Sequence, residues 1–275
     1  MKAKAIATAF EQIAHLDSGI PGDQLGFVWG NPETEVTGVG CAWCVHTESL
    51  QSCVRQGLNM IVCHEKLWLP AQDSPWYKGP DEAHILPRRL RRELLEKHGL
   101  VAYRSHSNWD AVPGDGVADS AVTALGLNGL KLVARQKFFS VQELPAPLSV
   151  QELHRHVQGA LGYGNCRIFG DAGKRIRRLA FLIGGFGENQ FHLPQAAMEL
   201  GAEALIIGEM SEFIVIGSLE MGLPVIETLH SVSEAPGIRR QAEVLAKRLP
   251  GLKVEYIPSG ALSFERTSTQ CGPRP

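Results

Sequence analysis

Residues 59–68 read NMIVCHEKLW, and this stretch decides how the rest of the chain is interpreted. Its apolar run at 60–63 predicts a buried strand, and the run leads directly into His64 and Glu65. The end of such a strand is either exposed to solvent or places two ligand residues at a binding site. Because adjacent side chains of a regular strand point to opposite faces, the two residues can bind the same ion only if the strand ends before them.

On either side of this stretch, short apolar runs alternate with amphipathic segments along almost the whole chain. That alternation is typical of βα units, and it predicts an α/β fold. The expected strands are residues 36–45, 58–64, 100–106, 130–139, 177–185, 203–209, 223–230 and 252–258. The expected helices are residues 47–57, 87–99, 149–162 and 233–251.

Local signals support the expected helices and indicate a joint in the chain. Pro87 occupies a first-turn position, and Ser149 forms a capping box with Glu152. Pro236 limits where the regular turns of the last helix can begin. The Pro-rich segment VQELPAPLSVQ, residues 141–151, predicts a joint between roughly the first 130 residues and a second unit that follows them.

Composition narrows the class of protein. The 275 residues carry a formal net charge of −2, so no global basic field favours nucleic acid or an anionic membrane as a partner. No apolar run approaches the roughly 18 to 20 residues that span a bilayer, and Glu11 interrupts the apolar pattern that a signal peptide would need. The six cysteines lack the density of a secreted disulfide scaffold. We therefore expect a soluble protein of a reducing compartment, the cytoplasm.

Two other motifs have ordinary structural interpretations, which we favour. Cys41 and Cys44 have the spacing of a redox or zinc knuckle, but no second CxxC is present and a strand would place their sulfurs on opposite faces. We expect structural cysteines, with Cys63 in the core of its own strand. The segment IGGFGENQ, residues 183–190, predicts the end of a strand followed by a Gly-rich turn. That turn could cradle a phosphate, but Gln190 breaks the dinucleotide fingerprint, so a plain tight turn is preferred.

The strongest chemical signal is the recurrence of His with Asp or Glu after expected strands. In open α/β sheets, ligands bind beyond the carboxyl ends of the strands, so such residues can converge on one crevice. Imidazole and carboxylate together suit zinc, manganese, iron or similar divalent ions. The pairs are His64 with Glu65, His106 with Asp110 in SHSNWDAVPGDG, and His230 with Glu234 in TLHSVSE.

The spacing of the last pair is informative. His230 and Glu234 are four residues apart, so a helical turn would place both side chains on one face, able to grip one ion. Any single His or Asp after a strand is usually a solvated cap or turn residue. Three such sites on separate strand ends are harder to dismiss, but on pattern alone a metal site and a set of ordinary turn residues remain alternatives.

Taken together, the three sites resemble the Nif-three-like family, the dinuclear-metal-centre hexameric proteins often named GTP cyclohydrolase 1 type 2 homologues. The resemblance covers roughly residues 35–258 and rests on three motifs in the family's order. These are VCHEKLW, HSNWD and IIGEMSEFIVIGSLEMGLPVIETLHSVSE.

The resemblance implies a set of metal ligands. A strand that ends in His-His, or His-Glu in a divergent branch, matches His64 and Glu65, although anchoring on Trp68 would instead place Cys63 and His64 on that pair. Glu65 stands where the commoner pattern has a second His, which makes the site harder and shifts its preference toward manganese, iron or magnesium. The implied ligands, expected together at one site, are His64, Glu65, Asp110, His230 and Glu234.

The resemblance also implies an architecture. It predicts two linked three-layer α/β domains with mixed sheets, in a ring-shaped hexamer whose metal sites face an internal cavity. The metal-binding domain would comprise residues 1–130 and about 225–275, and the second domain about 131–224.

Our first functional hypothesis is a metal-dependent hydrolase that acts on a nucleotide-like or phosphate-bearing small molecule. Two divalent ions per chain, bridged by Asp110 and Glu234, would activate a water molecule. His106 is the candidate catalytic residue for moving protons, and no further cofactor is expected. The alternatives are a non-catalytic metal-binding or metal-delivery protein and a scaffold in which the ions are structural.

Overall fold

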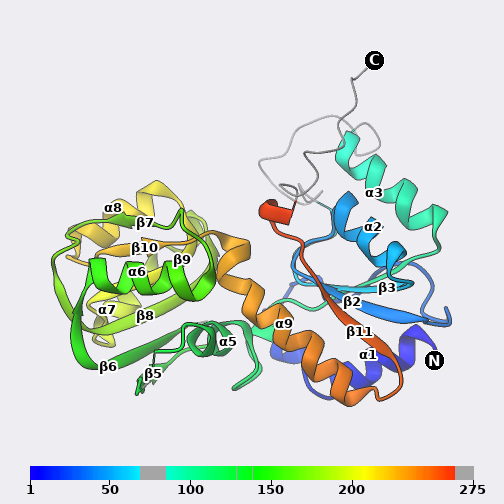
Figure 1. The fold of residues 1–275 in the computed structure, drawn as a ribbon, viewed down its shortest axis with the longest axis horizontal. Coiled ribbons are helices and arrows are strands. Elements are labelled where there is room, and N and C mark those ends of the chain that lie inside the picture. The colour runs from blue at the N-terminus through cyan, green and yellow to red at the C-terminus, as the bar shows by residue number, and fades with distance from the viewer. Residues whose placement is uncertain (69–84, 128, 138, 264–275) are drawn as a thin grey trace. The chain divides into compact units, whose positions relative to one another are not determined.

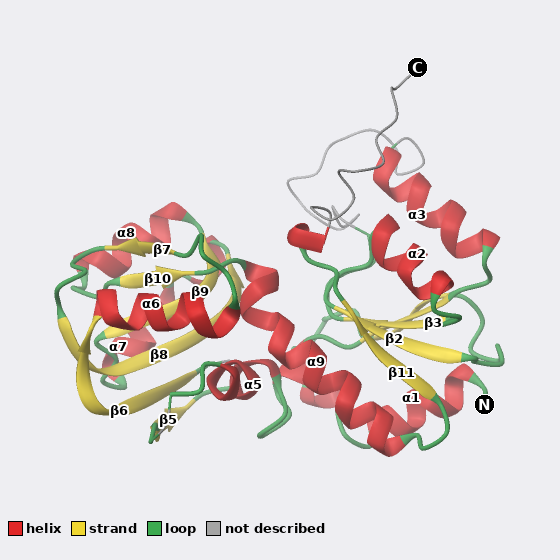
Figure 2. Cartoon of the chain, in the orientation of Figure 1, coloured by secondary structure: helices red, strands yellow, loops and turns green. Residues whose placement is uncertain are grey.

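The computed structural model describes residues 1–68, 85–127, 129–137 and 139–263. The described residues pack into two units (Figure 1). One unit is formed by residues 1–112 and by the described residues from 238 onward, and the other by residues 113–237. Each unit has its own sheet with helices packed on it (Figure 2), which confirms the prediction of two linked α/β domains with mixed sheets.

The first unit contains a five-stranded sheet. Four of its strands are parallel, and the edge strand β1 runs antiparallel to its neighbour β4. In sheet order, the strands are β1 (Gly26–Trp29), β4 (Val101–Arg104), β3 (Met60–Cys63), β2 (Gly38–Ala42) and β11 (Lys253–Ile257).

Helices cover both faces of this sheet (Figure 1). On one face, buried Leu50 and Leu95 pack with Ile61 of β3 in one apolar cluster. On the other face, the ring of Phe10 meets the ring of Tyr103 edge to face, with 6.3 Å between centroids. Among the residues that the structure describes, the helices of the first unit are α1 (Ala3–Glu11), η1 (Leu16–Ser18), α2 (Thr47–Arg55), α3 (Leu86–Lys97), α4 (Ser107–Asp110) and the later turns of α9 (His230–Arg248).

The second unit contains a mixed six-stranded sheet. Strands β8, β9 and β10 are parallel, and the remaining pairs are antiparallel. In sheet order, the strands are β5 (Lys131–Arg135), β6 (Ser140–Ser149), β8 (Arg175–Phe186), β9 (Ala204–Met210), β10 (Val225–Glu227) and β7 (Arg167–Phe169). The helices are α5 (Val117–Ala124), α6 (Val150–Leu161), η3 (Glu188–Gln190), α7 (His192–Glu199), α8 (Glu212–Glu220) and the first turns of α9.

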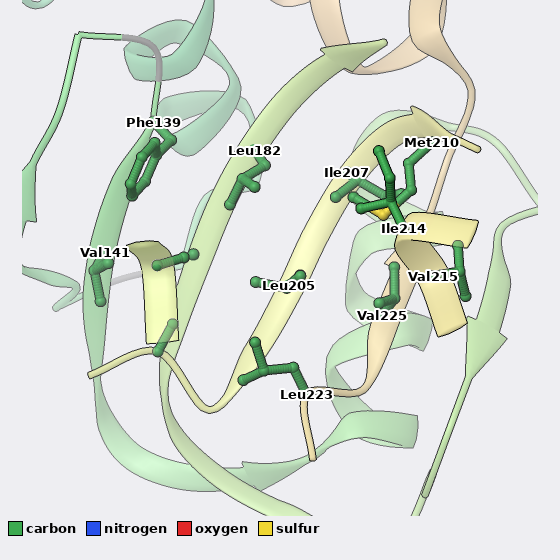
Figure 3. Packing of buried hydrophobic residues seen from close by; sticks show 13 residues of the cluster. Phe139, Val141, Leu182, Leu205, Ile207, Met210, Ile214, Val215, Leu223 and Val225 are labelled. Carbon is green, nitrogen blue, oxygen red and sulfur yellow. The ribbon is translucent and has the colours of Figure 1, made fainter. Parts of the chain in front are cut away.

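Alternation along β9 separates two cores in this unit. Leu205 and Ile207 pack with Ile214 and Val215 of α8 on one face (Figure 3). Ile206, between them, points to the opposite face, where it joins the cluster that contains side chains of α6. A strand that is buried on both faces has an almost continuous run of apolar residues, which is why the sequence predicted β9 clearly.

The chain passes between the units at positions other than those expected. The sequence analysis placed the boundaries near residues 130 and 225, whereas the chain leaves the first unit after Val112 and returns after Gly237. Helix α5 belongs to the second unit, and Leu125 at its C-cap is buried in that unit's core. Strand β10 is an inner strand of the second sheet, so the segment around it also belongs there.

The Pro-rich segment at 141–151 is a strand, so the prediction of a joint there is wrong. Strand β6 pairs with both β5 and β8. Pro145 and Pro147 lie where the register with β8 shifts, between Glu143 and Leu148. A proline lacks the N–H that a regular ladder uses, and an irregularity of this kind is where a sheet tolerates it.

The expected helices begin and end close to where the sequence predicts, except that α9 begins earlier than expected. The capping box is confirmed, since Ser149 N donates to Glu152 Oε2 at 2.7 Å and Glu152 N donates to Ser149 Oγ at 3.2 Å. Helix α9 begins at His230 rather than at 233, and Pro236 lies inside it. That early start places His230 in the first turn of the helix. None of the helices in the described part of the chain is long and apolar enough to cross a membrane.

The described cysteines are all free thiols. Cys41 and Cys63 are fully buried strand residues, as expected, but β2 ends at Ala42, so Cys44 lies beyond the strand. Burial is the main cause that raises the pKa of Cys44 to about 11, which suits a structural thiol rather than a reactive one. Cys271 lies outside the described residues.

Candidate metal centre

Strand β3 ends at Cys63, so His64 and Glu65 follow it in the chain. Their backbone N–H groups still donate to the carbonyl oxygens of Ala42 and Trp43, at 3.0 and 2.7 Å. The His64 side chain is fully buried and Glu65 is half-buried. The strand has ended before the pair, which is the condition under which adjacent residues can serve one site.

The His64 ring is oriented by the next strand. Its Nδ1 lies 3.2 Å from the carbonyl oxygen of Ser105, which follows β4. A carbonyl can only accept, so Nδ1 is the donor in this bond. Nε2 is then the atom directed toward Asp110, whose Oδ1 lies 3.6 Å away.

His106 and Asp110 bracket the short helix α4, with His106 at its N-cap position. The rings of His64 and His106 lie 4.7 Å apart, centroid to centroid. In the described part of the chain, His64, Glu65 and His106 each offer a ligand atom, and these atoms all lie within 4.8 Å of one another. The first unit therefore brings together a set of donors that suits a divalent ion.

A residue that the sequence analysis missed stands behind His106. Asp23 Oδ2 accepts a hydrogen bond from Nδ1 of His106 at 2.8 Å, and Asp23 Oδ1 pairs with the Arg104 guanidinium at 2.5 Å. Burial acts to raise the pKa of Asp23, but hydrogen bonds from its neighbours, that of His106 first, hold this pKa well below its usual range. No local pattern marks Asp23, because its partners lie more than 80 residues away in the sequence.

The second unit carries the other predicted pair. His230 Nε2 lies 3.2 Å from Oε2 of Glu234, so the two residues share one face of the first turns of α9, as their spacing predicted. Glu209 of β9 was also missed, and its Oε1 lies 3.1 Å from His230 Nδ1. The hydrogen bond from His230 is the main cause that lowers the pKa of Glu209, and the nearby charge of Glu234 partly opposes it.

The Gly-rich segment makes room for these side chains. A Cβ on Gly185 would lie 2.6 Å from Nδ1 of His230, and one on Gly184 would lie 2.7 Å from Oε1 of Glu234. Gly184 also has φ 107°, a conformation that favours glycine, at a register shift between β8 and β9. Strand β8 runs through both glycines to Phe186, one residue beyond the end of the expected strand at 177–185, and the short helix η3 follows it.

A cavity of about 560 Å³ opens beside His230 and Glu209 in the second unit. Glu227, which is 3% exposed, and Arg167 line it and form an ion pair. Glu227 Oε1 also accepts from the backbone N–H of Met210 at 3.3 Å. The cavity thus combines a buried carboxylate with an exposed guanidinium.

The predicted ligands come from both units of the chain. His64, Glu65 and Asp110 lie near one another in the first unit, together with His106. His230 and Glu234 lie together in the second unit. That all of them form a single centre stays a prediction, as does the assignment of His106 to proton transfer.

Comparison with known proteins places this arrangement in context. The sequence profile of the Duf34/NIF3 (NGG1p interacting factor 3) family matches residues 1–261. A Clostridium perfringens (strain 13 / Type A) protein named GTP cyclohydrolase 1 type 2 homolog is 27% identical over 267 residues, which cover 94% of this chain and 96% of that protein. A Pseudomonas aeruginosa protein of the same name is 34% identical over 200 residues, which cover 72% and 75%.

Solved structures agree at the level of the fold. The crystal structure of a Bacillus cereus protein related to NIF3 superposes with a TM-score of 0.78, and the match covers 95% of this chain and 97% of that one. The two sequences are 15% identical, so this likeness concerns the fold alone.

Proposed function

Because the chain belongs to the Duf34/NIF3 family, we propose that it binds a divalent metal and uses it to hydrolyse a nucleotide-like or phosphate-bearing small molecule. One observation carries the proposal: His64, Glu65 and His106 hold their ligand atoms within 4.8 Å of one another. Asp110 adds a carboxylate 3.6 Å from His64. The name GTP cyclohydrolase 1 type 2 homolog, which relatives carry, supports a nucleotide-like substrate.

The donor set fits a divalent metal. Two imidazoles with carboxylates are typical ligands of zinc, manganese and iron. The Nδ1 atoms of His64 and His106 each donate to an oxygen acceptor, which is how proteins usually orient a metal-binding imidazole. We assign His64, Glu65, His106 and Asp110 as ligands from the first unit, and propose His230 and Glu234 as ligands from the second.

The chain's own residues would set the chemistry. A bound divalent ion would lower the pKa of a water molecule and polarise the bond to be cleaved. The buried His64 side chain keeps bulk water from one side of the site. Two roles for His106 exclude each other, because an Nε2 that binds metal cannot also carry a proton, and its place in the donor cluster favours ligation.

We propose that the cavity in the second unit binds a phosphate-bearing small molecule. Its volume of about 560 Å³ lies within the roughly 300–1,000 Å³ that is typical of small-molecule pockets. Arg167 presents a guanidinium that suits phosphate, and His230 also lines the cavity. Arg167→Ala should therefore raise the KM for a phosphate-bearing substrate and leave metal content unchanged. An equal KM would remove this pocket from the proposal.

The decisive experiment joins metal analysis with turnover. The purified protein should retain a divalent ion by elemental mass spectrometry and should hydrolyse a member of a panel of GTP, other nucleotides and phosphate esters. His64→Ala should lose both properties, whereas the control His98→Ala, at an exposed helix end, should lose neither. Exchangeable metal without turnover on any compound would favour metal delivery, and no bound metal would refute the proposal.

We also propose that the chain assembles as a hexamer, as the family resemblance implies. Helix α8 supports an assembly, because Phe213 and Ile216 are large apolar side chains that lie exposed on it. Native mass spectrometry should give a mass six times that of the 30.0 kDa chain, and a monomer would contradict the proposal.

A further inference from the structure

The most constrained charged side chain near the candidate centre is Asp23. Its side chain is 9% exposed. Oδ2 accepts from Nδ1 of His106 at 2.8 Å and from the hydroxyl of Ser107 at 2.6 Å. Oδ1 pairs with the Arg104 guanidinium at 2.5 Å, so the buried charge is both neutralised and hydrogen-bonded.

Arg104 extends this arrangement to the second imidazole of the site. Its side chain is almost fully buried, and its Nε donates to the carbonyl oxygen of His64 at 3.1 Å. One terminal nitrogen also donates to the carbonyl oxygen of Gln24 at 2.8 Å. The Asp23–Arg104 pair therefore contacts the ring of His106 directly and the backbone of His64 through Arg104.

We infer that Asp23 is a positioning residue that fixes the His106 ring so that Nε2 is presented to the metal. The inference rests on the proposed metal binding. Asp23 does not need to touch the metal or the substrate, because it acts through His106.

Asp23 can fix the His106 ring because it determines which ring nitrogen carries the proton. A neutral imidazole carries one N–H, and a carboxylate can only accept, so Asp23 holds the proton on Nδ1 and leaves the lone pair on Nε2. Without this partner, the proton would distribute between both nitrogens and the ring would rotate more freely. A metal ion would then bind only the fraction of the protein with the correct tautomer and orientation.

The same arrangement recurs in the second unit, which supports a functional purpose. Glu209 lies 3.1 Å from Nδ1 of His230, on the side of the ring opposite to the contact with Glu234. A purely structural role would not require a carboxylate at Nδ1 of both histidines. Buried ion pairs are also weak contributors to stability, so fixed geometry is the better account of Asp23 with Arg104.

The test uses Asp23→Asn, with Asp17→Asn as the matched control because Asp17 is exposed six positions earlier. Zn²⁺ and Mn²⁺ affinities are measured in the full-length protein by chelator competition. We expect Asp23→Asn to weaken binding by about 10- to 100-fold, the usual effect of losing a partner behind a metal ligand. Asp17→Asn should bind like the wild type. Equal affinity in Asp23→Asn and wild type would overturn the inference.

A second readout in the metal-free protein separates this inference from the proposed function. Ring ¹⁵N shifts of His106 should report a proton on Nδ1 in the wild type and a mixture of tautomers in Asp23→Asn. Wild-type protein that binds no metal would refute the proposed function, while an unchanged tautomer in the variant would overturn the role of Asp23. If Asp23→Asn does not fold, Ser107→Ala removes one hydrogen bond to Asp23 and should weaken metal binding several-fold. An unchanged affinity in a folded Ser107→Ala would then count against the inference.

Discussion

At the scale of single residues, the candidate site depends on where each imidazole holds its proton. In each of three histidines, Nδ1 lies against an oxygen acceptor, so Nε2 is the nitrogen available for ligation in the neutral ring. The acceptors are the carbonyl oxygen of Ser105 for His64, Asp23 for His106 and Glu209 for His230. Residues with no metal-binding role of their own thus set the direction in which a ligand atom points.

In the second unit, the lack of a side chain at Gly185 determines where the His230 ring can lie. Gly185→Ala would place a Cβ 2.6 Å from Nδ1 of His230 and 3.0 Å from Oε1 of Glu209. The contact at 2.6 Å forces a shift and the contact at 3.0 Å is tight, so the His230 ring should move and its hydrogen bond to Glu209 should weaken. We expect altered ¹⁵N shifts of the His230 ring and at least a 10-fold loss in any metal affinity that depends on it.

The control for this substitution is Gly187→Ala. The nearest atom to a Cβ at Gly187 is Oδ1 of Asn189 at 3.5 Å, which is an ordinary contact. Its spectrum and affinity should match those of the wild type. A Gly185→Ala protein with an unperturbed His230 ring would show that β8 and α9 can adjust to the added methyl group.

At the scale of elements, the start of α2 has an uncommon cap. His46 accepts from the backbone N–H of Ser49 through Nδ1 at 3.3 Å, and its Nε2 lies 3.0 Å from the carbonyl oxygen of Ser259. Only the neutral ring can donate through one nitrogen and accept through the other. Burial is the main cause that lowers the pKa of His46 to about 4, and the charge of Arg91 adds to it.

This cap predicts a pH dependence of stability. The folded pKa of about 4 lies below the ordinary value of 6.5, so between these values the unfolded chain binds more protons than the folded one. The free energy of unfolding should therefore fall as the pH is lowered from about 6.5 to about 4. Urea denaturation of the metal-free protein at several pH values measures the change.

His46→Asn provides the comparison, because Asn also caps helices but does not titrate. The variant should show a flatter dependence on pH over the same window. If wild type and His46→Asn lose stability in parallel, other groups control the acid response and the cap does not.

At the scale of the whole molecule, metal binding should couple to stability. Glu65 and Asp110 bring two carboxylates to the His64 end of the first sheet, and a bound cation would offset their charge. A ligand present at about 100 times its Kd stabilises the native state by about 2.7 kcal/mol. Chelation should therefore lower the melting temperature of the wild type in calorimetry.

Asp110→Ala tests the assignment. It should lose metal but keep its fold, because removing one carboxylate also relieves repulsion in the metal-free state. The same chelator should then barely shift its melting temperature. Equal shifts in the variant and the wild type would mean that the metal binds elsewhere in the chain.

The sequence by itself determined the α/β class, each of the eight expected strands and the residues that stand at strand ends. These features are local: a buried strand is a short apolar run, and His230 and Glu234 share a face because they are four residues apart. The three motifs sufficed for the resemblance to the family because each is contiguous in the chain.

Tertiary structure alone decided what lies behind those motifs. Asp23 contacts His106 across 83 positions, and Gly185 of strand β8 faces His230 of helix α9, so no local sequence pattern indicates either contact. The prolines of β6 predicted a joint between two units because prolines are typical of segments that connect domains. The segment is a strand instead because it pairs with β5 and β8, and that pairing depends on residues elsewhere in the chain. Local propensity selects the elements, and burial against distant partners decides which side chains those elements bring together.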